Sequence, residues 1–228
     1  MTAVATTTPF GSLEHRARLT RGSSSGAVYA MVVDAVRSRR LGGGCLVDVG
    51  CGRGALWEML RGEFASYCGL DAVPYDGFPI DGSFLKADLD CPTWPIEEGI
   101  ADLVLSLETI EHLENPWAFM RGLARIAKPG AWVMVTTPNQ LSGLSLLALA
   151  ANHRFAAFTD AQYPVHKTAL LEVDLRRQAA AGGLVDAVIR YTSSGRIPKL
   201  SWHFPRVLSQ LLPRVCSDNL MLIARKPL

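Results

Sequence analysis

A turn built from alternating glycines restricts the fold of this chain more than any other feature. An apolar segment, residues 45–49, runs directly into Gly-Cys-Gly-Arg-Gly at residues 50–54, so that the pattern reads D-x-G-x-G-x-G from Asp48. Glycines at this spacing let the main chain turn sharply from a strand into a helix and approach a ligand, which the amides at the helix start then face. One glycine would indicate only a tight structural turn, whereas three after an apolar strand favour ligand binding.

The turn predicts an adenosine-containing ligand without specifying which one. Gly50, Gly52 and Ala55 also fit the G-x-G-x-x-A pattern of nicotinamide dinucleotide proteins. Asp71 lies 21 residues beyond Gly50, where an acid that binds ribose hydroxyls is expected for either ligand. A nicotinamide-dependent oxidoreductase is therefore one alternative at this point.

Strand and helix patterns alternate along the chain. Apolar strand patterns occupy residues 45–49, 67–71, 84–87, 101–107, 131–137, 184–191 and 220–224. One helical pattern follows the cap Ser23–Ser25, a second fills residues 55–61, and a third follows Asn115-Pro116 and stops at Lys128-Pro129-Gly130. A fourth begins at a cap on Thr168 and runs through Ala179. This order predicts an α/β fold, a doubly wound (Rossmann-like), mostly parallel seven-stranded sheet with helices on both faces.

Length and composition fit one domain. The 228 residues are 49% hydrophobic and 19% charged, enough for a large core. We expect an N-terminal arm of weak structure at residues 1–22 and a single domain at 23–228, with an insert at about 140–166 over the acceptor site. The longest apolar stretch, residues 141–151, is about half of the roughly 20 residues that a membrane-spanning helix needs. Five scattered cysteines and no signal-peptide pattern favour a reduced, cytoplasmic setting.

The stretch from Leu46 to Asn139 resembles the class I S-adenosylmethionine-dependent methyltransferases in the order and spacing of its motifs. VDVGCGRGAL is similar to their first motif, and GLDAV is similar to the strand that carries the ribose-binding acid. KADLD is similar to the loop whose acid meets the adenine. The fourth and fifth strand motifs are similar to ADLVLSLETIEHLENP and LARIAKPGAWVMVTTPN. The resemblance implies an S-adenosylmethionine-dependent methyltransferase, and within that class the chain is most similar to the O-methyltransferases of ubiquinone biosynthesis.

The resemblance also implies which residues hold S-adenosylmethionine. The methionine end would lie against Asp48 and the turn residues Gly50, Cys51, Gly52 and Gly54, the ribose hydroxyls against Asp71 and Ala72, and the adenine between Asp88 and Leu89. Each of these acids could instead be a solvated loop residue, above all Asp88.

An E-x-x-E-H sequence, Glu108 to His112, follows the strand at 101–107, at the sheet edge where ligands bind. In a helical turn Glu108, Glu111 and His112 would share one face. In a purely structural role, Glu111 and His112 would only cap and hydrogen-bond the loop.

The same motif is similar to that of the methyltransferases that modify the terminal 2′-hydroxyl of small RNAs, where it binds a divalent metal together with a distant histidine. In this chain the resemblance to the ubiquinone group places His166, in YPVHKTALLEVDL, at that position. The implied metal ligands are Glu108, Glu111, His112 and His166, and the implied catalytic residues are Glu111, His112 and His166. Mn, Fe, Co or Zn suit this ligand set, and Mg is a further candidate that prefers more oxygen ligands. Without a metal, His112 or His166 would serve as general base.

We expect O-methylation of a small or lipid-linked hydroxylated acceptor, of the sugar, catechol or quinol type. A net charge of +2 is too small to indicate nucleic acid. The apolar residues 141–151 favour a buried helix, with a lid or a membrane-contacting patch as the alternatives. The stretch Trp202–Leu212, with Arg206 and Arg214 nearby, favours an amphipathic helix packed on the sheet, with a peripheral membrane surface as the alternative. The alternatives are a non-catalytic regulatory or scaffold protein that binds S-adenosylmethionine, and a methyltransferase of RNA or protein. The sequence predicts no oligomeric state.

Overall fold

The computed structural model describes residues 13–197 and 202–228, and its centre is one seven-stranded sheet. The strands are β1 Cys45–Val49, β2 Ser66–Asp71, β3 Ser83–Lys86, β4 Ala101–Leu107, β5 Ala127–Pro138, β6 Val185–Tyr191 and β7 Asn219–Arg225. They lie in the order β3-β2-β1-β4-β5-β7-β6. The pairs among β1 to β5 are parallel, whereas β7 runs antiparallel between β5 and β6. The predicted doubly wound, mostly parallel α/β fold is confirmed.

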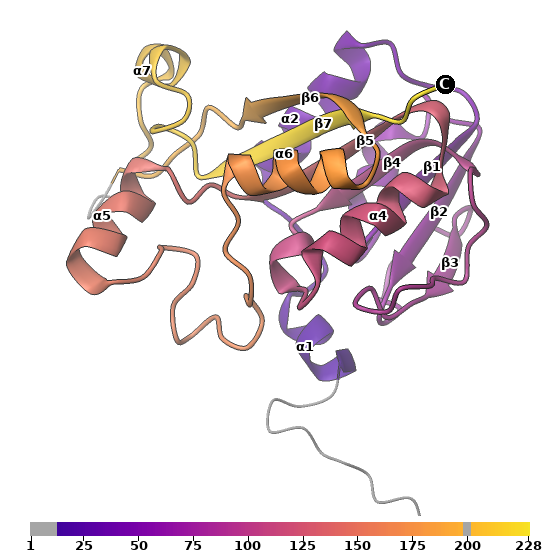
Figure 1. Cartoon of the computed structure of the whole chain (residues 1–228), viewed down its shortest axis with the longest axis horizontal. Helices are drawn as coiled ribbons and strands as arrows, with labels where there is room; N and C mark the ends of the chain where they lie inside the picture. Colours follow the sequence, from indigo (N-terminus) through magenta and orange to yellow (C-terminus); the bar gives the residue numbers. More distant parts are fainter. Residues whose placement is uncertain (1–12, 198–201) are drawn as a thin grey trace, which may run out of the picture.

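Helices cover both faces of the sheet. On one face lie α2 Gly26–Ser38 and α3 Ala55–Leu60, and on the other α4 Pro116–Ile126 and α6 Glu172–Ala181 (Figure 1). Successive residues of one strand therefore pack into the hydrophobic clusters on opposite faces of the sheet. In β1, Leu46 packs with the α2 and α3 side, and Val47 with the α4 and α6 side. Burial on both faces explains why β1 is a continuous apolar run.

Two helices begin where their sequence signals predict. The hydroxyl of Ser25 accepts a hydrogen bond from the amide of Val28 at the start of α2. The side chain of Asn115 accepts one from Ala118, and Pro116 takes the first position of α4, where a missing N–H costs nothing.

Two predicted boundaries are wrong. Helix α4 ends at Ile126 and β5 begins at Ala127, so Lys128-Pro129-Gly130 lies inside the strand, next to a register shift between Ala101 and Leu103. Helix α6 begins at Glu172, because the carboxylate of Asp174 accepts a hydrogen bond from the amide of Leu171. Thr168 does not cap this helix. Its hydroxyl donates to the carbonyl of Leu113 instead.

Three further helices lie outside the two core layers: α1 Leu13–Leu19, α5 Gly143–Asn152 and α7 Arg206–Leu211. The expected weak structure of the N-terminal arm is wrong for residues 13–19, and residues 1–12 lie outside the described part of the chain. The expected burial of α5 and α7 is also wrong. Each buries one serine, Ser145 in α5 and Ser209 in α7, and both project at one end of the molecule (Figure 1). Among the described residues, no helix is long and apolar enough to cross a membrane.

The topology places a crevice at the carboxyl ends of the central strands. From β1 the chain proceeds to β2 and β3 on one side, and later to β4 and β5 on the other. Ligands of such sheets bind beyond the carboxyl ends of the strands at this reversal. Gly50, Asp71 and Glu108 lie at or just after the carboxyl ends of β1, β2 and β4.

Candidate active site

A cavity of about 540 Å³ lies at the carboxyl ends of β1, β2 and β4. Its floor comes from the turns after β1, β2 and β4. One wall is the N-terminal segment, including α1 and Ser23–Ser25, and the other is the segment 161–166 that follows α5. The insert predicted over the acceptor site therefore contributes to the cavity.

Most of the predicted site residues line this one cavity. They are Asp48, Gly50, Cys51, Gly52, Asp71, Ala72, Leu89, Glu108, Glu111, His112 and His166. Gly54 and Asp88 are not among the lining residues. Gly54 precedes α3 with φ +71°, and a Cβ there would lie 2.4 Å from Cδ of Pro79, so a side chain at this position would clash with Pro79. Asp88 is exposed and accepts a hydrogen bond from the amide of Asp90, which lines the cavity in its place.

Two glycines of the turn are required by neighbouring protein atoms. A Cβ on Gly50 (φ +78°) would lie 2.1 Å from Oγ1 of Thr109, in the turn after β4. A Cβ on Gly52 (φ +53°) would lie 2.3 Å from the carbonyl oxygen of Gly22. Both distances are far below van der Waals contact, so a side chain would displace either the β4 turn or the N-terminal segment.

Two acids lie beside the turn. Asp71 accepts hydrogen bonds from the amides of Gly52 (2.9 Å) and Ala72 (2.7 Å), which positions its carboxylate at the cavity floor. Asp48 is buried and accepts a hydrogen bond from the hydroxyl of Tyr67 at 3.1 Å. Burial raises the pKa of Asp48 to about 7, because the charged form is poorly solvated there. A cationic ligand group near Asp48 would favour its ionised form.

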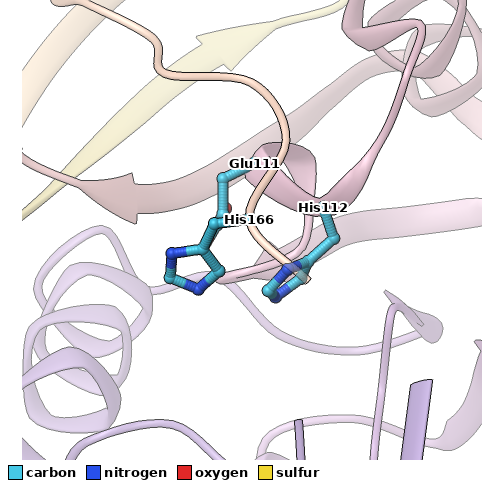
Figure 2. Close-up of side chains that lie close together, drawn as sticks. All are labelled: Glu111, His112 and His166. Atoms are coloured by element: carbon cyan, nitrogen blue, oxygen red, sulfur yellow. The ribbon is translucent and has the colours of Figure 1, made fainter. Parts of the chain in front are cut away.

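Glu111, His112 and His166 form a compact group at the cavity wall. One ligand atom from each lies within 4.8 Å of the others, and the two imidazole rings are 4.9 Å apart between centroids. Figure 2 shows the three side chains gathered from the short helix η1 Ile110–His112 and the segment before α6. The two histidines belong to segments that are far apart in the sequence, so only the tertiary fold brings them together.

Both imidazoles are oriented by main-chain carbonyls. Nδ1 of His112 lies 2.9 Å from the carbonyl oxygen of Val165, and Nδ1 of His166 contacts that of Ala157. A carbonyl only accepts, so Nδ1 carries the proton in each ring and Nε2 keeps its lone pair in the neutral form. Burial lowers the pKa of both histidines, and the neighbouring His112 lowers that of His166 further. A neutral ring that keeps one unprotonated nitrogen suits metal coordination or proton abstraction.

Glu111 connects the two parts of this group. Its main-chain carbonyl accepts hydrogen bonds from the amides of Lys167 (2.8 Å) and Thr168 (3.0 Å), which holds the His166 segment against η1. Its buried carboxylate accepts one from the hydroxyl of Thr137 at 3.1 Å. Burial raises the pKa of this carboxyl, and a bound cation would lower it again.

Glu108 does not join the group as predicted. It has a positive φ of 49° and is followed by η1 rather than by a regular helical turn. Its carboxylate accepts hydrogen bonds from the hydroxyl of Thr136 and the amide group of Asn219. Among the described residues, the carboxylates and imidazoles close enough to share a cation are those of Glu111, His112 and His166. Glu108 still lines the cavity, and burial followed by repulsion from Glu111 raises its pKa.

Several lining residues were not predicted as site residues. They are chiefly Arg16, Ser23–Ser25, Tyr29, Tyr75 and Asn219. The serines signalled only a helix cap, and α1 carried no ligand motif. Their place in the cavity follows from a long-range contact, since the amide of Arg53 donates to the carbonyl of Gly22. No local pattern in the sequence indicates such a contact.

Comparison with known proteins identifies the family of this chain. A family model described as "Methyltransferase domain" matches residues 27–185, more than half of the chain. The ubiquinone biosynthesis O-methyltransferase of Thiobacillus denitrificans is 31% identical over 120 residues, which cover 48% of this chain and 50% of that protein. The mitochondrial enzyme of the same description from Arabidopsis thaliana is 36% identical over 106 residues, 41% of this chain and 32% of that one. The chain thus spans half or less of the length of these relatives.

Solved structures show the same fold. The crystal structure of a SAM-dependent methyltransferase from Archaeoglobus fulgidus superposes with a TM-score of 0.61 at 18% identity. The superposition covers 87% of this chain and 94% of that one. Identity this low supports the fold, and the arguments about chemistry rest on the cavity.

Proposed function

Because this chain belongs to the class I S-adenosylmethionine-dependent methyltransferase family, we propose that it transfers the methyl group of S-adenosylmethionine to a hydroxyl oxygen of a small or lipid-linked acceptor. Oxygen is proposed as the methylated atom because the curated relatives are described as O-methyltransferases. The relatives' description as enzymes of ubiquinone biosynthesis favours an acceptor of the catechol or quinol type, and a sugar with neighbouring hydroxyls would meet the same site chemistry.

The charge of the cavity carries the cofactor assignment. Five carboxylates line it, and among the described residues Arg16 is the single lysine or arginine that does so; the acids are Asp48, Asp71, Asp90, Glu108 and Glu111. S-adenosylmethionine brings a sulfonium and an ammonium against one carboxylate, a net positive charge. Burial raises the pKa values of Asp48, Glu108 and Glu111, and a cationic ligand would favour their ionised forms, whereas the negative diphosphate of a nicotinamide dinucleotide would disfavour them. The acid-rich lining therefore supports the sulfonium cofactor.

The spacing of Tyr163 and Lys167, four residues apart, also occurs in hydride-transfer pairs. Here the segment between them is irregular rather than helical, and Nζ of Lys167 lies 2.6 Å from the carboxylate of Glu114. Lys167 is therefore engaged in an ion pair outside the lining of the cavity. This arrangement gives no support to an oxidoreductase.

Each part of the floor has a proposed role in holding the cofactor. Asp71, positioned by two amides, would accept hydrogen bonds from the ribose hydroxyls. Asp48 would face the methionine end, where a positive ammonium would stabilise its ionised form. Leu89 would pack on the adenine, and Asp90 stands nearer to the cavity than Asp88.

We also propose a divalent cation, Mn in preference to Mg, at Glu111, His112 and His166, because two of the three ligands are imidazoles. The donor set fits, because one ligand atom from each of the carboxylate and the two imidazoles lies within 4.8 Å of the others and main-chain carbonyls orient both rings. When bound, a cation at this position lowers the pKa of an acceptor hydroxyl and orients it toward the methyl group. In the absence of a cation, Nε2 of His112 or His166 would accept the hydroxyl proton as general base.

Isothermal titration calorimetry tests the cofactor assignment. We expect S-adenosylmethionine to bind the wild-type chain, and Asp71→Ala to weaken binding by about 10- to 100-fold, because hydrogen bonds to a charged group contribute about 1.5–3 kcal/mol. Asp88→Ala is the matched control, since this exposed acid lies outside the cavity lining, and we expect nearly unchanged affinity. Tighter binding of NADH than of S-adenosylmethionine would contradict the assignment.

A further inference from the structure

Two neighbouring threonines at the carboxyl end of β5 each bind one carboxylate of the E-x-x-E-H sequence. The hydroxyl of Thr136 donates to the carboxylate of Glu108 at 2.8 Å, and the hydroxyl of Thr137 donates to that of Glu111 at 3.1 Å. Both threonines are fully buried, and neither is among the residues that line the cavity. Any part that they take in the reaction must therefore act through the two acids.

The two threonines lie on opposite faces of the sheet, because successive side chains of a strand alternate between its faces. Just before them in β5, Met134 packs with the α2 and α3 side, and Val135 packs with the α4 and α6 side. Thr136 therefore continues the first face and Thr137 continues the second. The two carboxylates, although only three residues apart in the chain, are thus held by hydroxyls that point in opposite directions.

The hydrogen bond from Thr137 restrains a carboxylate that belongs to the proposed cation site. Among the described residues, Glu111 shares that site with His112 and His166. A glutamate carboxylate turns readily about its last bond unless a partner holds it, since that torsion has broad minima. With one oxygen held at the strand, the other oxygen keeps a defined direction, just as main-chain carbonyls orient the two imidazoles. All three ligands would then be oriented before a cation binds.

We infer that Thr137 is a positioning residue of the cation site, and that its hydroxyl holds the carboxylate of Glu111 in the direction that a divalent cation requires. This inference rests on the cation proposed under the methyltransferase function. Indirect partners that orient a metal ligand typically contribute about 10- to 100-fold to metal affinity. Thr136 has no such role, because Glu108, whose carboxylate it holds, lies outside the group of potential ligands found among the described residues.

The test measures the affinity of the full chain for Mn²⁺ by calorimetry, with S-adenosylhomocysteine bound. Thr137→Val replaces the hydroxyl by a methyl group, and we expect it to lower Mn²⁺ affinity by about 10- to 100-fold. Thr137→Ser keeps the hydroxyl and should recover most of that affinity. Thr137→Ala also lacks the hydroxyl, and it takes the place of the valine variant if that variant does not fold.

Thr136→Val is the matched control, because it makes the same substitution at an equally buried neighbour in the same strand. It should bind Mn²⁺ at least as tightly as the wild type. An equal loss in Thr136→Val would show a general effect on the strand and would overturn the inference. Wild-type affinity in Thr137→Val, or a Thr137→Ser variant as weak as Thr137→Val, would overturn it as well.

Failure of the proposed function would look different. A wild type that does not bind S-adenosylhomocysteine would contradict the methyltransferase assignment itself. A wild type that binds S-adenosylhomocysteine but no Mn²⁺ would contradict the proposed cation, and the role of Thr137 with it, while the cofactor assignment would stand.

Discussion

At the scale of single residues, the turn after β1 is held open by what packs around it. Gly50 lies against Thr109 and Gly52 against Gly22, so two distant segments meet the turn where it has no side chains. A ligand-binding role and a packing role coincide at these positions. Gly54, by contrast, packs against Pro79.

Stability measurements separate the two constraints on Gly50. Gly43 is a control with nearly the same φ, +71° against +78°, but a Cβ added to it would have no neighbour within 4 Å. Gly43→Ala should cost about 1–2 kcal/mol for the left-handed backbone alone. Gly50→Ala should cost about 1–3 kcal/mol more, because the new methyl group overlaps Thr109. Urea unfolding measures both, and equal losses would show that the contact with Thr109 relaxes freely.

At the scale of elements, the proposed cation site depends on two segments that the chain separates. The turn η1 supplies Glu111 and His112, and the segment before α6 supplies His166. The amides of Lys167 and Thr168 attach that segment to the carbonyl of Glu111. The geometry of the site is therefore set by main-chain hydrogen bonds as much as by the ligands themselves.

Removal of the His166 imidazole should weaken cation binding while the domain stays folded. His166→Ala should weaken Mn²⁺ binding at least about tenfold, since even indirect partners of metal ligands are worth that much. His203→Ala is the control, because this exposed histidine is not among the residues that line the cavity. Calorimetric titration with Mn²⁺ provides the comparison. Unchanged affinity in His166→Ala, with activity that persists in excess chelator, would leave a histidine base as the mechanism.

Elements with strong local signals were predictable, and those decided by distant contacts were not. The apolar run of β1 and the caps of α2 and α4 sufficed to predict those elements. The direction of the Glu108 side chain depends on Asn219, which is 111 residues away. For α5 and α7 an apolar composition indicated burial, but no partner element covers them among the described residues.

At the scale of the whole molecule, the exposed apolar residues of α5 and α7 gather at one end. The amide of Gly143, at the start of α5, donates to the carbonyl of Val215 beyond α7, which joins the two helices. Leu147 of α5 is 47% exposed, and Leu211 of α7 is 73% exposed. Arg206 lies at the start of α7 and adds positive charge. An apolar surface that carries an arginine matches an anionic lipid surface, and we propose peripheral contact there, consistent with a lipid-linked acceptor.

Vesicle co-sedimentation tests this contact. Leu211→Glu should lower binding to phosphatidylglycerol-containing vesicles by about tenfold, because burial of a leucine is worth about 1.5–3 kcal/mol and the new charge repels the lipid. Ile80→Glu is the control, since Ile80 is fully exposed but lies in the loop between β2 and β3, at the opposite edge of the sheet. Equal loss in both variants, or no wild-type binding, would contradict the proposal.

The contact between Gly22 and Gly52 couples the N-terminal wall of the cavity to its floor. Main chain rests on main chain there, and the amide of Arg53 donates a hydrogen bond to the carbonyl of Gly22. A side chain at residue 52 would therefore have to push the N-terminal segment outward, and the width of the cavity would change together with the shape of the turn.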